Sequence, residues 1–178
     1  MNQFKIKIAL STVLLFLSAS SLYAETAGQY LQNGNDDFKQ DNLDQAIYEY
    51  TKAIDLNPNL AKAFNNRGVA YAREGSLSRA IADFTMAISD NSRDADAYNN
   101  RGHAYASLHN FTQAILDYSK AVDINAIYVN AYRNREIAYY KTEQYDKAWA
   151  DARKIVKIGG ANDPDFIEEL KKASGKSQ

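Results

Sequence analysis

The chain has 178 residues, of which 21 are basic and 22 acidic, and it contains no cysteine. The missing cysteines exclude disulfides, thiol nucleophiles and thiolate metal sites. The nearly balanced charge does not suggest nucleic acid or an anionic membrane surface as a partner. A hydrophobic content of 46%, with 13 tyrosines and two prolines, favours a folded helical protein over a disordered one.

The first 24 residues have the order of a secretory signal peptide: a basic start at Lys5 and Lys7, an apolar stretch over residues 8–17, and small residues up to Ala24. The apolar stretch is shorter than the ~20 residues of a spanning helix. We therefore expect cleavage after Ala24, with an uncleaved membrane anchor as the alternative. The mature chain would carry 19 basic and 22 acidic residues and would not contact a membrane. An exported protein without cysteines fits a bacterial periplasm.

The rest of the chain is repetitive, because residues 61–94 and 95–128 carry identical residues at fourteen of 34 aligned positions. A repeat of this length is one supersecondary unit, and such units stack into an extended array. The offset of 34 also relates Ala46, Ala80, Ala114 and Ala148. It predicts four units at about 27–60, 61–94, 95–128 and 129–162.

Each unit is predicted to be a helical hairpin, since its apolar residues recur at intervals of three and four. In the second unit, Phe64, Gly68 and Tyr71 form one stripe, Ala80 and Phe84 begin another, and residues 74–76 read as a turn between them. Gly68 and Ala80 are small, which predicts close approach of the two helices.

At these positions the chain resembles the tetratricopeptide repeat (TPR) family. The resemblance implies an all-α, right-handed superhelical α-solenoid of four TPR helical hairpins. In the second and third units it rests on Phe64, Gly68, Tyr71, Gly75, Ala80, Phe84 and Ala87, and on Tyr98, Gly102, Tyr105, Phe111, Ala114, Tyr118 and Ala121.

The pattern changes in the last unit, where Glu136 replaces the helix-contact glycine and Ala152 replaces the aromatic residue, so we expect a looser last hairpin. Beyond it, residues 159–160 are glycines that stop a helix, and Asp163-Pro164 reads as the start of another. Residues 163–178 are thus predicted to form a C-terminal capping helix with a short tail.

Repeated polar residues are interpreted as structural. Arg67, Arg101 and Arg135 stand sixteen residues before Asp83, Asp117 and Asp151, which favours ion pairs that tie the two helices of each hairpin over an anion-binding ladder. An exposed pair of this kind contributes only about 0–1 kcal/mol. Asn57, Asn91 and Asn125 are expected to cap helices or form turns. His103 and His109 lie on different helical faces, so we predict no metal site. No catalytic residue and no cofactor are predicted.

TPR proteins generally bind an extended peptide or a partner helix on the concave surface lined by their first helices. The resemblance implies a groove of about 30 Å here, enough for roughly nine extended residues. Its asparagines suit peptide backbone groups, although about half of the positions could be plain scaffold residues. The predicted lining is Asn65, Asn66, Val69, Arg73, Asn99, Asn100, His103, Ser107, Arg133, Asn134, Ile137 and Lys141, extended by Asn35 and Lys39.

The predicted function is a non-enzymatic protein-interaction scaffold in the cell envelope, with an unidentified protein or peptide partner. Docking of a terminal carboxylate, as in the chaperone-binding TPR proteins, is not expected, because Asp96 would repel it and two cations are missing. A self-associating structural protein, or an accessory or chaperone factor for secretion or envelope assembly, are the alternatives. Residues that differ between units, such as Val69 and His103, are expected to select the partner.

Overall fold

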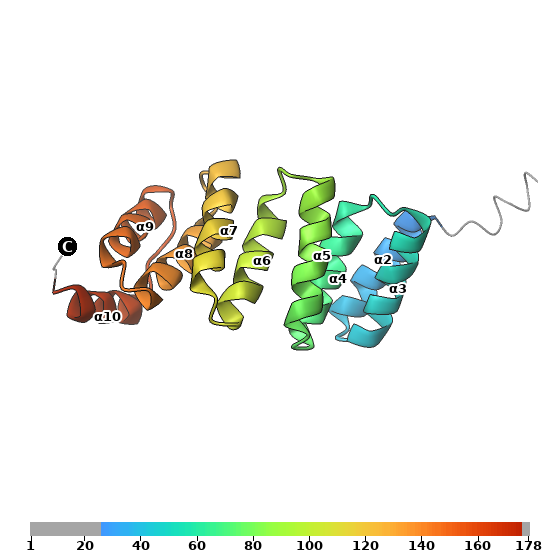
Figure 1. The fold of residues 1–178 in the computed structure, drawn as a ribbon, viewed down its shortest axis with the longest axis horizontal. Helices are drawn as coiled ribbons and strands as arrows, with labels where there is room; N and C mark the ends of the chain where they lie inside the picture. Colours follow the sequence, from blue (N-terminus) through green and yellow to red (C-terminus); the bar gives the residue numbers. More distant parts are fainter. Residues whose placement is uncertain (1–25, 176–178) are drawn as a thin grey trace, which may run out of the picture.

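The computed structural model describes residues 26–175, and within them the chain forms nine α-helices and no strand. The predicted signal peptide (1–24) and residues 176–178 lie outside the described residues. Figure 1 shows the helices following one another along the long axis, with the last helix lying across the end of the row. The helices are α2 (Ala27–Lys39), α3 (Leu43–Leu56), α4 (Ala61–Arg73), α5 (Leu77–Asp90), α6 (Ala95–Ser107), α7 (Phe111–Ile124), α8 (Val129–Lys141), α9 (Tyr145–Lys157) and α10 (Pro164–Ser174).

Four consecutive pairs, beginning with α2 and α3 and ending with α8 and α9, form antiparallel hairpins. Each hairpin turns through one residue with a left-handed backbone: Asp41, Gly75, His109 and Glu143, with φ between 58° and 83°. Only one of the four is glycine, the residue that adopts this conformation without steric cost. His109 is exposed there, as expected for a turn residue.

Inside each of the first three hairpins, a glycine of the first helix faces an aromatic ring of the second. A Cβ atom on Gly68 would lie 2.7 Å from a ring carbon of Phe84, and Gly34 and Gly102 stand in the same way against Tyr50 and Tyr118. Such contacts are too close for any side chain. The predicted close approach of the paired helices is therefore confirmed, with the alanine at position 80 fully buried.

The fourth hairpin exchanges large and small residues at these two positions. Glu136 stands in the glycine column and is only 3% exposed, while Ala152 stands in the aromatic column and is fully buried. The glutamate thus occupies space that a ring fills elsewhere. Its Oε1 is buried and has no hydrogen-bond partner among the described residues. Helices α8 and α9 pack less closely than the paired helices of the other three hairpins, so the expectation of a looser last hairpin is confirmed. The unsatisfied carboxyl group there also costs stability.

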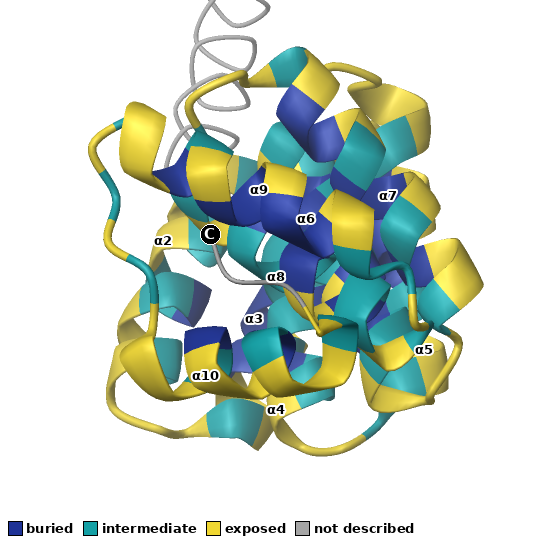
Figure 2. Ribbon diagram, turned by 90° about the vertical axis from the view of Figure 1, so that its left-hand side faces the viewer, coloured by how far each residue is buried: buried dark blue, intermediate teal, exposed yellow. Residues whose placement is uncertain are grey.

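Helix α10 covers the end of the stack. Its N-cap, Asp163, accepts hydrogen bonds from the backbone amides of Asp165 and Phe166, and Pro164 occupies the first turn. Ile167 and Leu170 pack with Ala148, Trp149 and Ala152, and the Phe166 ring meets that of Tyr140 edge-on at 5.3 Å. Figure 2 views this end, where α10 lies across the buried parts of the stack.

The predicted fold class is confirmed: the described residues form an all-α solenoid with a C-terminal capping helix. The search of residues 26–175 for a helix with the length and hydropathy to cross a bilayer finds none. The hairpin stack places every first helix (α2, α4, α6, α8) on one side, here called the first-helix face, and every second helix (α3, α5, α7, α9) on the other.

Candidate functional site

The recurring arginines hold the scaffold together. Arg67 donates from Nε and Nη2 to the two carboxylate oxygens of Asp83, at 2.8 and 2.9 Å, and from Nη1 to Thr51 of the preceding unit at 2.9 Å. Arg101 and Arg135 repeat this arrangement with Asp117 and Thr85, and with Asp151 and Ser119. The predicted pairing within each hairpin is confirmed.

These pairs are largely buried, which the sequence did not show. The side chains of Arg67 and Asp83 are only 16% and 9% exposed, since the ring of Phe64 lies against the guanidinium. A largely buried, bidentate pair costs far more to break than a surface pair. The contact to Thr51 was not predicted, although Thr51, Thr85 and Ser119 recur at the same offset of 34. Each arginine therefore joins two units as well as two helices.

The capping asparagines are also structural. The Oδ1 atoms of Asn57, Asn91 and Asn125 each accept a hydrogen bond at 3.2 Å from the backbone amide two residues later. This local turn, formed just after a second helix ends, is a common role of asparagine. The prediction for these residues is confirmed.

Three hollows lie in a row on the first-helix face, one between each two neighbouring first helices. The first, between α2 and α4, has a volume of about 260 Å³; the second, between α4 and α6, about 330 Å³; the third, between α6 and α8, about 260 Å³. Together they are called the first-helix groove below. Their linings are, in order, Gln32, Asn35, Phe38, Lys39, Tyr50, Asn66 and Val69; Val69, Ala72, Arg73, Leu77, Phe84, Asn99, Asn100, His103 and Ser107; and His103, Ala106, Ser107, Phe111, Tyr118, Asn134, Ile137 and Ala138.

Nine of the twelve predicted lining residues border a hollow, as do Asn35 and Lys39. The other three, Asn65, Arg133 and Lys141, border none of these hollows. Asn65 is held between two other asparagines. Arg133 donates to the carbonyl of Ala161 at 2.8 Å, and the Lys141 ammonium lies 5.6 Å from the ring centre of Tyr140.

The groove also contains residues that the sequence analysis assigned only to the core. Tyr50, Phe84 and Tyr118 form the aromatic floors of the three hollows. These rings fill the space over the glycines and are only 1% exposed, so they close the hollows from below as part of the core. Their common column in the repeat was visible in the sequence, but not their position beneath the hollows.

The asparagines of the groove bind one another from helix to helix. Asn66 donates to Asn35 at 2.7 Å, and Asn100 donates to Asn65 at 3.1 Å. Asn134 donates to Asn99 at 3.0 Å. We expected these amides to bind the backbone groups of a peptide. Each of the three donors instead uses one N–H in a hydrogen bond to an asparagine of the preceding first helix. Each Nδ2 has a second N–H, and no hydrogen bond to Oδ1 of Asn100 or Asn134 is found among the described residues.

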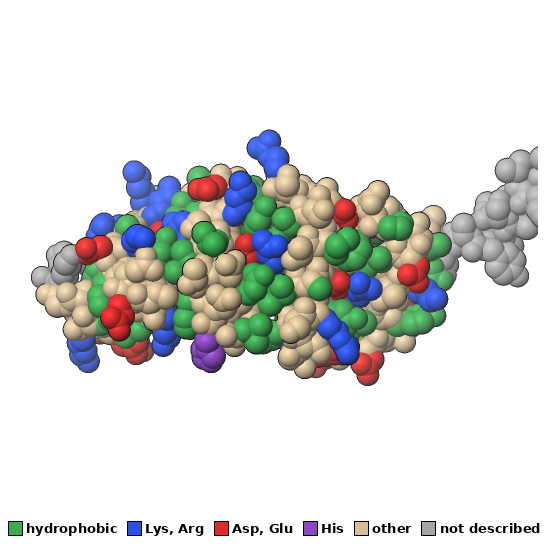
Figure 3. Space-filling model, in the orientation of Figure 1, with side chains coloured by type: hydrophobic (Ala, Val, Ile, Leu, Met, Phe, Trp, Pro, Cys, Tyr) green, Lys and Arg blue, Asp and Glu red, His purple; other side chains and the backbone are tan. Residues whose placement is uncertain are grey.

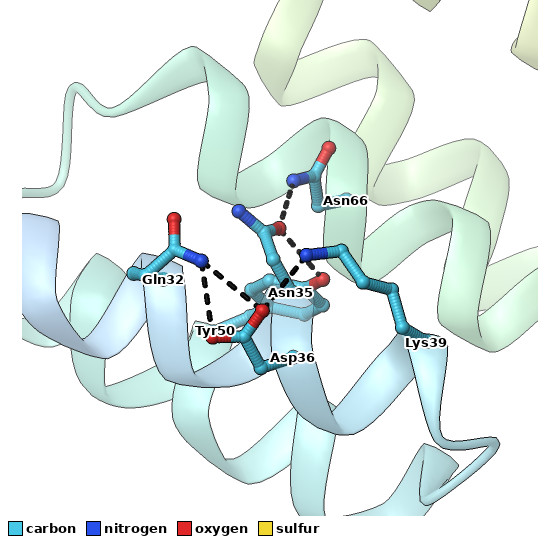
Figure 4. Close-up of polar contacts among 6 residues, drawn as sticks. All are labelled: Gln32, Asn35, Asp36, Lys39, Tyr50 and Asn66. Carbon is cyan, nitrogen blue, oxygen red and sulfur yellow. Dashed lines mark hydrogen bonds and ion pairs between the residues drawn. The ribbon is translucent and has the colours of Figure 1, made fainter.

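Figure 4 shows the polar groups around the first hollow. Asn35 is the centre of this group, because its Oδ1 accepts from both Asn66 and the Tyr50 hydroxyl, the latter at 3.0 Å. Burial raises the pKa of Tyr50 to about 12, so it remains a neutral donor. Lys39 and Gln32 both donate to the exposed carboxylate of Asp36. An apolar floor is thus bordered by fixed amides and one ammonium group.

The two histidines do not form a site together. His103 is exposed on α6 and borders the second and third hollows, whereas His109 lies in the turn before α7. No group of three or more His, Cys, Asp or Glu side chains in the part of the chain that the structure describes is placed to hold a metal ion. His103 is therefore interpreted as a lining residue of the groove.

Comparisons with known proteins agree with this architecture. The sequence matches the family described as TPR repeat over residues 34–75 and the one described as tetratricopeptide repeat over residues 95–126. Over 44 residues it is 46% identical to Hsp70-Hsp90 organizing protein 1 of Arabidopsis thaliana, a match that covers 25% of this chain and 8% of that protein.

Two solved structures extend the comparison over most of the stack. The MamA protein is similar with a TM-score of 0.74 and 24% identity, covering 85% of this chain and 84% of MamA, which shows the fold alone. The first TPR domain of Spaghetti (RPAP3), bound to the HSP90 peptide SRMEEVD, is similar with a TM-score of 0.66 and 28% identity. That match covers 67% of this chain and 95% of the domain. The chain therefore contains tetratricopeptide repeats, which family models match over residues 34–75 and 95–126.

Proposed function

We propose that this TPR protein is an interaction scaffold that binds an extended peptide or a partner helix in its first-helix groove. The observation that carries the proposal is the row of three hollows, each with an aromatic floor and an amide at its edge. Concave, mostly apolar surfaces with a few fixed polar groups are typical of binding sites. A row of such hollows suits an elongated ligand.

The comparison with RPAP3 supports this proposal, since that TPR domain is described as bound to an HSP90 peptide. The ligand of this chain is expected to differ. Asp96 here lies on α6, where it accepts a hydrogen bond from the Tyr128 hydroxyl. A carboxylate in that place repels a terminal carboxylate, as the sequence analysis expected.

Selection from a peptide-display library on the full-length chain tests the proposal, using two matched variants. Val69→Arg places a long cation between the first and second hollows. Leu116→Arg makes the same change on the second-helix side, where Leu116 is 59% exposed. We expect Val69→Arg to abolish binding of the selected peptides and Leu116→Arg to leave it unchanged. Peptides that bind Val69→Arg as well as the parent would show that the groove is not the site.

A second candidate function is self-association through the second-helix side. Tyr48 on α3, Met86 on α5 and Leu116 on α7 are 53%, 45% and 59% exposed. Figure 3 shows hydrophobic side chains spread along the side on which α3, α5 and α7 lie in front, with lysines and arginines between them. Mass measurement at several concentrations tests this candidate, and a strict monomer refutes it.

We further propose that the protein acts in the cell envelope after export, as a scaffold or as an accessory factor for secretion or assembly. The support is the order of basic, apolar and small residues over positions 1–24. Expression in bacterial cells, fractionation and intact-mass measurement test this proposal. We expect a periplasmic protein that begins at Glu25; a cytoplasmic protein with an intact N-terminus would refute export.

A further inference from the structure

We infer that the first-helix groove binds a segment in the polyproline II conformation, with an apolar side chain at every third residue. The inference rests on the proposed function, because it names the ligand of the same groove. It follows from two features of the described residues: the spacing of the three hollows, and the hydrogen-bonding groups that the asparagines still present.

The spacing of the hollows matches the period of polyproline II. One hollow lies between each two neighbouring first helices, and packed helices lie about 8–10 Å apart. A polyproline II segment turns once in three residues and rises ~9.3 Å in that turn, so residues i, i+3 and i+6 point to one side at about this spacing. A β-strand returns to the same side every ~6.7 Å, which places its second side chain between two hollows.

An α-helical ligand also has a matching period, since residues i and i+7 lie about 10.5 Å apart on nearly one face. The asparagines distinguish the two ligands. A helix has already satisfied the N–H and C=O groups along its length, whereas polyproline II has no internal hydrogen bonds. Amides along the edge of a groove can therefore form few hydrogen bonds with the backbone of a helix, but many with a backbone whose N–H and C=O groups are unpaired.

The amides recur at the same interval as the hollows. Asn66 borders the first hollow, Asn100 the second and Asn134 the third. Each donates to an asparagine of the preceding first helix, which fixes the amide plane. What remains is one N–H on each, and on Asn100 and Asn134 an Oδ1 as well. Asn66 thus offers a donor alone, because its Oδ1 accepts from Asn65. At Asn100 and Asn134 one donor and one acceptor serve a carbonyl and the N–H of the apolar residue, even where the two residues between are prolines.

The apolar contacts are supplied by the floors and walls. Leu77 is half-buried and lines the second hollow, and Phe111 is half-buried and lines the third. The rings of Phe84 and Tyr118 are fully buried and close these two hollows from below. His103 lies between the second and third hollows, just as Val69 lies between the first and second. Aromatic-lined grooves that hold a preformed, low-entropy polyproline II ligand are a recurring mode of recognition.

Three fluorescein-labelled peptides test the inference by anisotropy with the full-length chain. The first has the sequence LPPLPPLPP; the second, LPLPLPPPP, has the same composition with leucine at every second residue; the third is an amphipathic helix with leucine at every seventh. We expect the first to bind at least about tenfold more tightly than either of the others. Binding within twofold of the others, tighter binding of the helix, or no binding of the first peptide would overturn the inference.

Variants link the result to the groove. Asn100→Ala and Asn134→Ala should each weaken the first peptide about fivefold, and Val69→Arg should abolish its binding while Leu116→Arg has no effect. Because the asparagines also bind each other, replacing one could lower the melting temperature. In that case the affinities of the three peptides for the unmodified chain decide whether the inference holds. Library peptides that need Val69 but lack the three-residue period would refute this inference and leave the proposed function standing.

Discussion

Replacing Glu136 by glutamine should remove a pH-dependent loss of stability. Burial, and then the nearby carboxylates of Asp151 and Asp163, raise the pKa of Glu136 from 4.5 to about 7, against a smaller opposite effect of Arg133. The folded protein therefore holds this proton more tightly than the unfolded chain. The resulting stability is fully present below about pH 4.5 and is lost as the pH rises through about 7.

The size of the effect follows from the shift. A rise of the Glu136 pKa by roughly 2.5 corresponds to about 3.5 kcal/mol, at about 1.4 kcal/mol per pH unit. Some solvent access and relaxation around the carboxylate reduce this, so we expect about 2 kcal/mol. Glutamine is nearly isosteric with the protonated acid and does not titrate. The difference in unfolding free energy between the Glu136→Gln variant and the parent should therefore change with pH. At about pH 8 it should favour the variant by about 2 kcal/mol more than it does at about pH 4.5.

Urea denaturation followed by far-UV circular dichroism, at intervals between about pH 4.5 and about pH 8, measures this difference. Subtracting the unfolding free energy of the parent from that of Glu136→Gln at each pH removes the contribution of all other titrating groups, which the two proteins share. Glu169→Gln on the exposed side of α10 is the control and should show a flat difference. A flat difference for Glu136→Gln as well, or one that shrinks as the pH rises, would refute the reasoning.

Three further predictions concern the scaffold and are all measured as urea unfolding free energies. Arg101→Leu should destabilise by about 3 kcal/mol, because it leaves the largely buried carboxylate of Asp117 without its bidentate partner; a loss below about 1 kcal/mol would mean that the pair behaves as an exposed one. Gly68→Ala should cost about 1–3 kcal/mol, since its Cβ would lie 2.7 Å from the Phe84 ring, whereas Gly28→Ala, whose nearest neighbour is at 3.7 Å, should be neutral or stabilising. His109→Gly should stabilise by about 1 kcal/mol by relieving a left-handed backbone at φ 58°, and a loss would show that the imidazole contact with Phe111 outweighs that strain.

Much of the fold could be predicted because one rule recurs every 34 residues. The positions of Gly68, Phe84 and Ala80 predict a hairpin, and the structure places the ring over the glycine. The arginine–aspartate pairs followed from the same spacing, but their burial did not. Burial depends on Phe64 of the same helix, whose ring lies against the guanidinium, and on the preceding unit, whose Thr51 accepts a hydrogen bond from it. Contacts between units leave only an indirect trace in a single sequence.

The groove was predicted less completely, for a physical reason. Residue type alone shows that Asn100 can donate and accept, but not that it already donates to Asn65. Likewise, Tyr118 is recognisable as a core ring and is 1% exposed, yet its position beneath the hollow between α6 and α8 depends on how neighbouring units pack. Side-chain orientation and gap width arise from packing between helices and not from any one helix.

The exchange at Glu136 and Ala152 shows how the end of the stack limits the groove. In the first three units an aromatic ring forms both the filling over the glycine and the floor of a hollow. In the fourth unit Ala152 stands in the place of that ring, and Ile167 and Leu170 of α10 pack with it and with Trp149. The Phe166 ring rests on Tyr140, which stands where Ala106 lines the third hollow. A fourth hollow would need both the ring and an uncovered α8. The chain has replaced the ring and covered α8 with its own helix, so a ligand that follows the groove from α2 has three hollows to fill and must end, or turn away, at α10.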